Sequence, residues 1–235
     1  VADGTGAGMG ATSVQSLHRR NLTRDAAEPF KFEQIVPYYN GRPQMSDPPA
    51  TAWMQLGMFS LADRMGMGTD VKARVGQARL LSVLMALLAV AAMYWLGYAI
   101  GEVPTALFGA LIFAANPLFV YHARQATPSM HMLAWTTLSI AAATWAIRPM
   151  RPAPSVERQL IGWFICGLSM GAATLTVGIR GVFLCALPVL IILILCPNRI
   201  SHLLGLLAAV LIHSLMVLAW AVHSTETWQL VAALA

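Results

Sequence analysis

The sequence predicts an all-α integral membrane protein, a polytopic bundle of about six transmembrane helices beneath an N-terminal cap. Hydrophobic residues make up 57% of the 235-residue chain and charged residues only 11%, too few for the polar surface of a soluble domain. The charges are also uneven, because most of them precede Arg79 and residues 80–101 carry none. Such long uncharged stretches are stable in hydrocarbon, so we expect the lipid bilayer to surround most of the chain.

The uneven charge divides the chain into two parts. Residues 1–79 are expected to form a cap outside the bilayer, and residues 80–235 the transmembrane bundle. The chain begins with Val1 rather than Met, and residues 228–235 have the apolar character of the start of another helix. We therefore expect a piece of a longer polypeptide, with a bundle that is incomplete at its C-terminus.

The cap is expected to hold little regular structure before residue 50. Residues 1–12 are rich in Gly and Ala without an apolar period, which predicts an irregular arm. A polar amphipathic helix is predicted around residues 24–35, interrupted at Pro29. The dipeptide Asn40-Gly41 is typical of a tight turn.

Residues 50–65 are apolar at helical spacing, but the segment is too short and too polar to cross about 30 Å of hydrocarbon. One interpretation is a helix on the membrane surface, with Trp53 and Phe59 in the interface. The alternative is a helix packed inside the cap, and the sequence leaves both open.

The bundle is predicted from apolar stretches separated by short polar or Pro-containing links. These stretches are residues 80–100, 105–121, 130–147, 160–177, 182–196 and 202–222. Several are short for a span, which is expected where helices pack in a large bundle.

The arginines in the links predict the orientation of the bundle. Links after the third and fifth stretches carry Arg148, Arg151, Arg158 and Arg199, and the links on the other side carry Arg124 and Arg180. Because cytoplasmic loops are enriched in Lys and Arg, the larger group is expected in the cytoplasm. The cap, Arg124 and Arg180 then share the extracytoplasmic face.

Charge and composition also exclude several kinds of site. The net charge is +5, but the arginines are scattered between apolar stretches and form no basic stripe, so no nucleic acid partner is expected. Anionic lipid headgroups or a lipid-linked phosphate are the expected partners. The three cysteines and six histidines show neither disulfide nor metal-ligand spacing, so no metal site is predicted from them.

Several short motifs occur in the order found in a known family. Residues 36–43 read VPYYNGRP, residues 47–49 DPP, residues 78–80 ARL, residues 116–119 NPLF and residues 123–128 ARQATP, and Arg180-Gly181 lies within residues 167–188. The set resembles the GT-C glycosyltransferases that use polyprenyl-phosphate sugars, in the branch with lipid A aminoarabinose transferase and bacterial relatives of protein mannosyltransferase. The resemblance covers residues 35–196.

The resemblance implies a bacterial inner-membrane transferase with its cap in the periplasm and a donor sugar carried on polyprenyl phosphate. A donor with its tail in lipid needs a membrane groove that opens toward a polar cap, and cations to hold the leaving phosphate. Arg124 and Arg180 are the candidates for these cations, with interfacial anchoring as the alternative role of each. Asn40 and Asp47 occupy motif positions that the resemblance assigns to the substrate and lipid-phosphate site.

The sequence departs from the family at charged positions. Residues 17–18, which align with the family's acidic pair, carry no carboxylate, so Asp25 or Glu28 is the candidate for the group that deprotonates the acceptor or binds a divalent metal. Asp47 replaces a lysine of the family, and Ser129 replaces an acidic residue.

Three functional hypotheses follow from these observations. The first is an active glycosyltransferase. The second is a catalytically degenerate relative that serves as a structural subunit of a larger membrane protein complex. The third is a transporter or channel, although the mid-span polar residues are only Ser, Thr and His, and no inverted repeat is visible.

Overall fold

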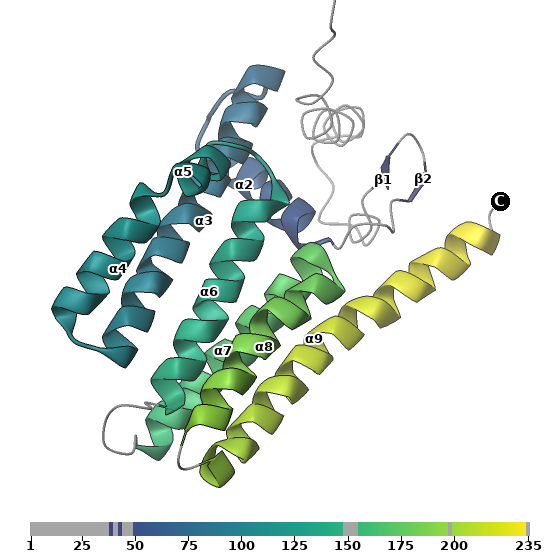
Figure 1. Ribbon diagram of the computed structural model, residues 1–235. Coiled ribbons are helices and arrows are strands. Elements are labelled where there is room, and N and C mark those ends of the chain that lie inside the picture. Colours follow the sequence, from purple (N-terminus) through teal and green to yellow (C-terminus); the bar gives the residue numbers. More distant parts are fainter. Residues whose placement is uncertain (1–37, 40–41, 44–48, 148–154, 197–198, 234–235) are drawn as a thin grey trace, which may run out of the picture.

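The structure is a computed structural model that describes residues 38–39, 42–43, 49–147, 155–196 and 199–233 (Figure 1). The described elements are, in chain order, the strands β1 (Tyr38–Tyr39) and β2 (Arg42–Pro43) and the helices α2 (Ala50–Arg64), α3 (Val71–Ile100), α4 (Val103–Ala115), α5 (Pro117–Ala123), α6 (Pro128–Ile147), α7 (Val156–Val177), α8 (Ile179–Leu195) and α9 (Arg199–Ala233). The arm and the helix predicted around residues 24–35 lie outside the described residues.

The strands β1 and β2 form a small antiparallel pair, with Tyr38 opposite Pro43 and Tyr39 opposite Arg42. They flank the predicted tight turn at Asn40-Gly41, which itself lies outside the described residues. Within the described residues, this pair is the one element that is not helical, and the all-α prediction did not include it.

Helix α2 confirms the helix predicted from residue 50, but one of its aromatic residues is placed differently. Phe59 is only 9% exposed and packs against Ala78 of α3. Its ring therefore contacts other parts of the protein. Phe59 fits the alternative interpretation, a helix packed inside the cap.

Helix α3 begins at Val71, well before the apolar stretch that predicted it, and runs without interruption to Ile100. The cap boundary predicted after Arg79 thus falls inside a continuous helix. Hydropathy predicts where a segment enters hydrocarbon, but it does not predict where a helix begins. A helix can extend beyond its apolar stretch when its polar residues pack against other elements. Extended Asp70 precedes the first helical turn.

Helices α4 and α5 replace the single span predicted over residues 105–121, because the chain bends by 67° between them. Pro117 lacks an amide hydrogen and restricts Asn116 to an extended backbone, so one helix cannot continue through this point. The Asn116 side chain then accepts hydrogen bonds from the amides of Leu118, at 2.9 Å, and Phe119, at 3.4 Å. This cap starts α5 in its new direction.

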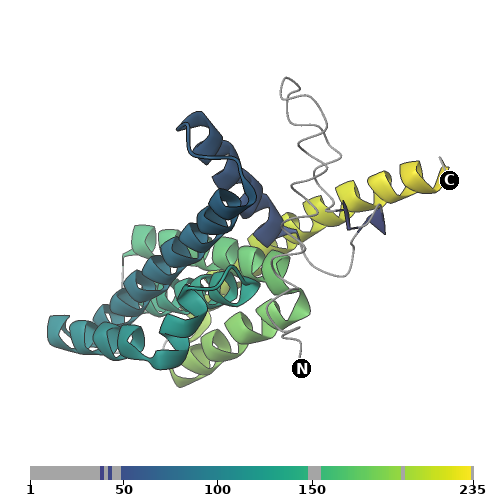
Figure 2. The same ribbon diagram turned by 90° about the horizontal axis from the view of Figure 1, so that it is seen from above.

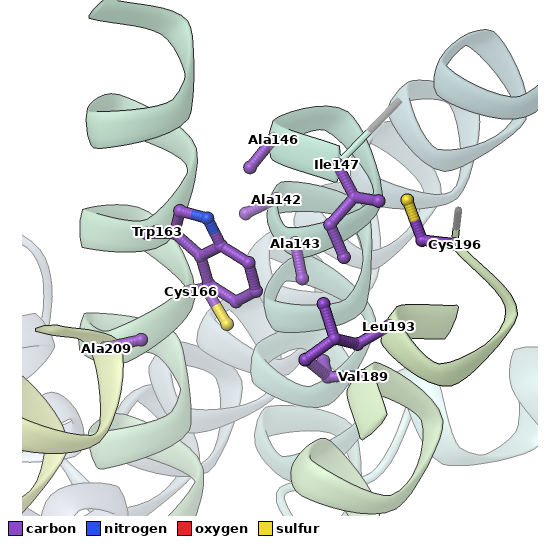
Figure 3. Packing of buried hydrophobic residues seen from close by; sticks show 10 residues of the cluster. All are labelled: Ala142, Ala143, Ala146, Ile147, Trp163, Cys166, Val189, Leu193, Cys196 and Ala209. Atoms are coloured by element: carbon purple, nitrogen blue, oxygen red, sulfur yellow. The ribbon is translucent and has the colours of Figure 1, made fainter. Parts of the chain in front are cut away.

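The bundle is assembled around α6, which packs along α3 on one side and α7 on the other, while α9 packs along α7 (Figure 1). Small residues dominate the contact between α6, α7, α8 and α9 (Figure 3). The cluster consists of Ala142, Ala143, Ala146, Ile147, Trp163, Cys166, Val189, Leu193, Cys196 and Ala209. Small side chains let helix backbones approach closely, which is how membrane helices gain packing energy.

Trp163 shows how close that approach is. Its side chain is 2% exposed, and a Cβ added to Gly205 of α9 would lie 2.1 Å from an indole carbon. The indole ring therefore lies directly on the α9 backbone, in a space that only glycine leaves free.

Three helices are long and apolar enough to cross a membrane, with spans Lys72–Ile100, Val156–Val177 and His202–Val222, and the bent pair α4 and α5 makes a fourth if counted as one span. The described residues thus form an integral membrane fold with three or four clear spans. Of the other predicted spans, α8 has only 17 residues, and α6 carries several Ser, Thr and His side chains. In both views the C-terminal half of α9 projects away from the other helices (Figures 1 and 2).

Candidate functional site

The two arginines predicted to bind phosphate, Arg124 and Arg180, lie at the same end of the bundle. Arg124 directly follows α5 and caps its C-terminus, and Arg180 lies in the first turn of α8. The end of α5 and the start of α8 are both on the side of the bundle that carries α2 (Figure 1). Both side chains are exposed, and neither makes a hydrogen bond or ion pair within the described part of the chain.

Arg124 borders a shallow cavity of about 490 Å³ that is open to the surface along α5 and is lined by Pro117, Val120, Tyr121, Arg124 and Gln125. Most of this lining is apolar, and Arg124 is its charged residue. A cavity with apolar walls and one cation at its edge is suited to a ligand that joins a hydrocarbon chain to an anionic group.

Arg180 is placed by a tight turn between α7 and α8. Gly178 ends α7 with a φ of 69°, a conformation that glycine adopts without strain. Gly181 then packs against α7 so closely that an added Cβ would lie 2.5 Å from the carbonyl carbon and oxygen of Ala173. The first turn of α8 is thus pressed against the last turns of α7, which fixes the backbone that carries Arg180.

Four other candidate residues cannot be placed. Asp25, Glu28, Asn40 and Asp47 all lie outside the described residues. Their proposed roles in catalysis and in substrate or lipid-phosphate binding therefore remain predictions.

The carboxylates that the structure does place lie away from the cavity lining. Among the described side chains, Asp63 bonds to Arg74, and Asp70 precedes α3. Glu102 and Glu157 stand at the starts of α4 and α7, at the opposite end of the bundle (Figure 1). Within the described residues, no group of three His, Cys, Asp or Glu side chains is arranged to hold a metal ion.

Sequence reasoning missed Arg74, a buried cation near the start of α3. Arg74 is 4% exposed and donates hydrogen bonds to the carbonyl of Phe59 at 3.2 Å, to Oε1 of Gln77 at 3.0 Å and to Oδ1 of Asp63 at 2.6 Å. Its guanidinium also lies 5.1 Å from the centroid of the Phe59 ring. The sequence feature that could have indicated its burial is that Arg74 lies four residues before the apolar Ala78, and therefore on the same face of a helix.

The other end of the bundle is marked by Arg158, one of the arginines predicted to be cytoplasmic. Its Nε donates to the Trp145 carbonyl at 3.0 Å, and its guanidinium lies 4.3 Å from the centroid of the Trp145 ring. Trp95 packs against Trp145 with ring centroids 5.4 Å apart. Paired tryptophans beside an arginine are typical of a membrane–water interface.

Comparison with known families decides how this layout is interpreted. Residues 69–226 match the profile of the family described as Dolichyl-phosphate-mannose-protein mannosyltransferase. The chain belongs to this family. The resemblance inferred from the short motifs is thereby confirmed, and the part of the chain that matches the mannosyltransferase family includes both arginines.

Solved structures extend the comparison to the fold of this mannosyltransferase-family chain. ArnT from Cupriavidus metallidurans matches in its apo state with a TM-score of 0.71 and in a complex with undecaprenyl phosphate with a TM-score of 0.70. In both cases the identity is 20%, and the match covers 92% of this chain but only 37% of ArnT. A likeness at this identity shows the shared fold. A search of curated proteins finds no match.

Proposed function

We propose that this protein transfers a sugar from a polyprenyl-phosphate donor to an acceptor at the extracytoplasmic face of a membrane. The observation that carries the proposal is the position of Arg124 at the edge of an apolar cavity of about 490 Å³, in a chain of the mannosyltransferase family. The complex of ArnT with undecaprenyl phosphate supports a polyprenyl phosphate as the ligand class.

The proposed chemistry needs one base and at least one cation. The acceptor hydroxyl attacks the anomeric carbon of the donor sugar, the bond from that carbon to the phosphate oxygen breaks, and polyprenyl phosphate leaves. Arg124 and Arg180 stabilise the charge that develops on the phosphate. Asp25 or Glu28 accepts the proton from the acceptor or holds a divalent metal ion that activates it.

The proposed placement puts residues 1–79 on the periplasmic side of a bacterial inner membrane. In this arrangement α6 and α8 also cross the bilayer, which gives the six spans expected from the sequence. Support comes from the packing of α6 along α3 and α7 and from α8 running back along α7 after a tight turn (Figure 1). A helix surrounded by other spans tolerates the polar side chains that lower the hydropathy of α6.

The direct test is release of polyprenyl phosphate from a donor with a labelled sugar, measured with purified protein in detergent. We expect release by the unmodified protein and its loss in Arg124→Ala and Arg180→Ala. The matched control is Arg64→Ala, because Arg64 is an exposed cation at the end of α2 and has no assigned role. Unchanged turnover in both arginine variants would discard the site assignment.

A second candidate function is a catalytically degenerate subunit of a membrane protein complex. It is favoured by the lining of the cavity, which includes no carboxylate among the described residues, and by Asp47 in the place of the family's lysine. The two candidates differ in one measurement, because a degenerate subunit would bind undecaprenyl phosphate without releasing it from a donor. Co-purification with a membrane protein partner would then identify its complex.

A further inference from the structure

The segment that carries Arg124 is held at both of its ends. We call residues 124–127, which join α5 to α6, the Arg124 loop. At its start, the amide of Arg124 donates to the carbonyl of Tyr121 at 3.3 Å, and the amide of Gln125 donates to that of His122 at 3.1 Å. These bonds tie the loop to the end of α5, beside the cavity.

The other end of the loop is held by a buried histidine. His131 is 0% exposed in the first turns of α6, and its Nδ1 lies 3.2 Å from the carbonyl oxygen of Thr127. A carbonyl oxygen can only accept, so this hydrogen bond requires the proton to be on Nδ1. The imidazole thus donates to the last residue of the Arg124 loop.

The middle of the loop packs against α2 and α3. Ala126 packs against Phe59 of α2 and Ala78 of α3. Phe59 is in turn fixed by Arg74, which donates to its carbonyl and stacks over its ring. The loop is therefore held between an apolar contact on one side and the His131 hydrogen bond on the other.

We infer that His131 is a positioning residue, which holds the Arg124 loop so that the Arg124 guanidinium stays at the edge of the cavity. The bond from Nδ1 is the one polar interaction that the ring makes within the described part of the chain, since Nε2 has no partner there. Burying an imidazole with an unpartnered nitrogen is costly, and leucine would fill a similar volume without that cost. The bond to Thr127 is what the histidine provides and an apolar residue does not.

The test compares three substitutions at the same site. His131→Asn places an amide donor near the position of Nδ1, His131→Gln places one near Nε2, and His131→Leu removes both. We expect amide hydrogen exchange at residues 124–127 to become about tenfold faster in the Leu and Gln variants, and to stay within about twofold of the unmodified protein in the Asn variant. The Leu and Gln variants lose one of the hydrogen bonds that oppose the opening of the loop, whereas the Asn variant keeps it.

The matched control is His202→Leu. His202 is also buried, at 3% exposure, but lies on α9, so its replacement should leave exchange at residues 124–127 unchanged. Unchanged exchange in the Leu and Gln variants would overturn the inference, and so would equal acceleration in His202→Leu. If the Leu variant does not fold, the contrast between Asn and Gln decides the question.

The functional consequence rests on the proposed function and is measured separately. We expect the Gln variant to bind undecaprenyl phosphate about tenfold more weakly than the Asn variant, because a displaced Arg124 loses its charge-assisted contact. If Arg124→Ala itself leaves this affinity unchanged, the proposed phosphate site fails. The exchange measurements then still decide whether His131 holds the loop.

Discussion

Nη2 of Arg74 lies 2.6 Å from Oδ1 of Asp63, and the two partners differ in exposure, at 5% for the arginine side chain and 44% for the aspartate. The pair joins α2 to α3. Because the cation is buried between the two helices, this pair differs from an isolated surface ion pair.

The first prediction concerns the coupling between these two residues. Asp63→Asn and Arg74→Met should each lower the free energy of unfolding by about 1–2 kcal/mol, with the effect of Asp63 limited by its exposure. The double variant should lose about 1 kcal/mol less than the sum, because either single substitution already removes the ion pair. The measurement is equilibrium unfolding in detergent of four purified proteins: the unmodified protein, the two single variants and the double variant.

The control for this cycle is Lys72→Met, since Lys72 is exposed near the start of α3. It should change the free energy of unfolding by less than about 0.5 kcal/mol. Simple additivity of Asp63→Asn and Arg74→Met would show that the bond between the two side chains contributes nothing to stability.

The second prediction concerns the turn that places Arg180. Gly181→Ala should lower the free energy of unfolding by about 1–3 kcal/mol, because the new methyl group meets backbone atoms of Ala173 that have no room to move. Gly109→Ala, in the middle of α4, meets nothing within 4 Å and should be neutral or stabilising by up to about 1 kcal/mol. Equal effects of the two substitutions in thermal unfolding would contradict the close packing of α7 and α8.

The third prediction separates charge from geometry at Arg180. Lysine keeps the positive charge, so Arg180→Lys should keep the affinity for undecaprenyl phosphate within about threefold, whereas Arg180→Ala should weaken it about tenfold or more. Vesicles containing undecaprenyl phosphate and matched vesicles without it provide the measurement. A Lys variant as weak as the Ala variant would mean that the fork of the guanidinium, and not its charge, is required.

The fourth prediction tests the orientation of the bundle. The native cysteines Cys166, Cys185 and Cys196 are buried, so a thiol introduced at an exposed position should be labelled selectively. In intact cells, a membrane-impermeant maleimide should react with Arg64→Cys, and with Glu157→Cys only after the membrane is opened. The reverse pattern would place the cap in the cytoplasm.

The fifth prediction uses the charge reversal at Asp47. Asp47→Lys restores the cation that the family resemblance assigns to the lipid phosphate, and should raise the affinity for undecaprenyl phosphate about tenfold. Asp47→Asn, which only removes the negative charge, should give a smaller gain. No gain in either variant would remove Asp47 from the proposed site.

Much of the bundle could be predicted because apolarity and turn chemistry act locally. The predicted end of the fourth span at residue 177 coincides with the end of α7, because Gly178 adopts a positive φ there. The start of α3 could not be found in this way, since Arg74 is buried through contacts with α2 that hydropathy does not register. The bend at Asn116-Pro117 was not predicted, because the apolar residues on both sides suggested a single span.

The candidate site was predictable only in part for a similar reason. The order of the links was enough to put Arg124 and Arg180 on one face. The cavity beside Arg124 depends on the direction that α5 takes after the 67° bend. A local sequence pattern does not predict this direction. The role inferred for His131 likewise depends on the backbone carbonyl of Thr127. Every residue has such a carbonyl, so the sequence does not indicate which one the histidine bonds to.

The continuity of α3 has a mechanical consequence. A helix of 30 residues is about 45 Å long, whereas the hydrocarbon layer is about 30 Å thick. An untilted α3 would therefore extend roughly 15 Å beyond the acyl chains, as the difference of these two lengths. Helix α3 has no break between Val71 and Ile100. A movement of α2, which is bonded to α3 through Arg74, would therefore also move the apolar part of α3.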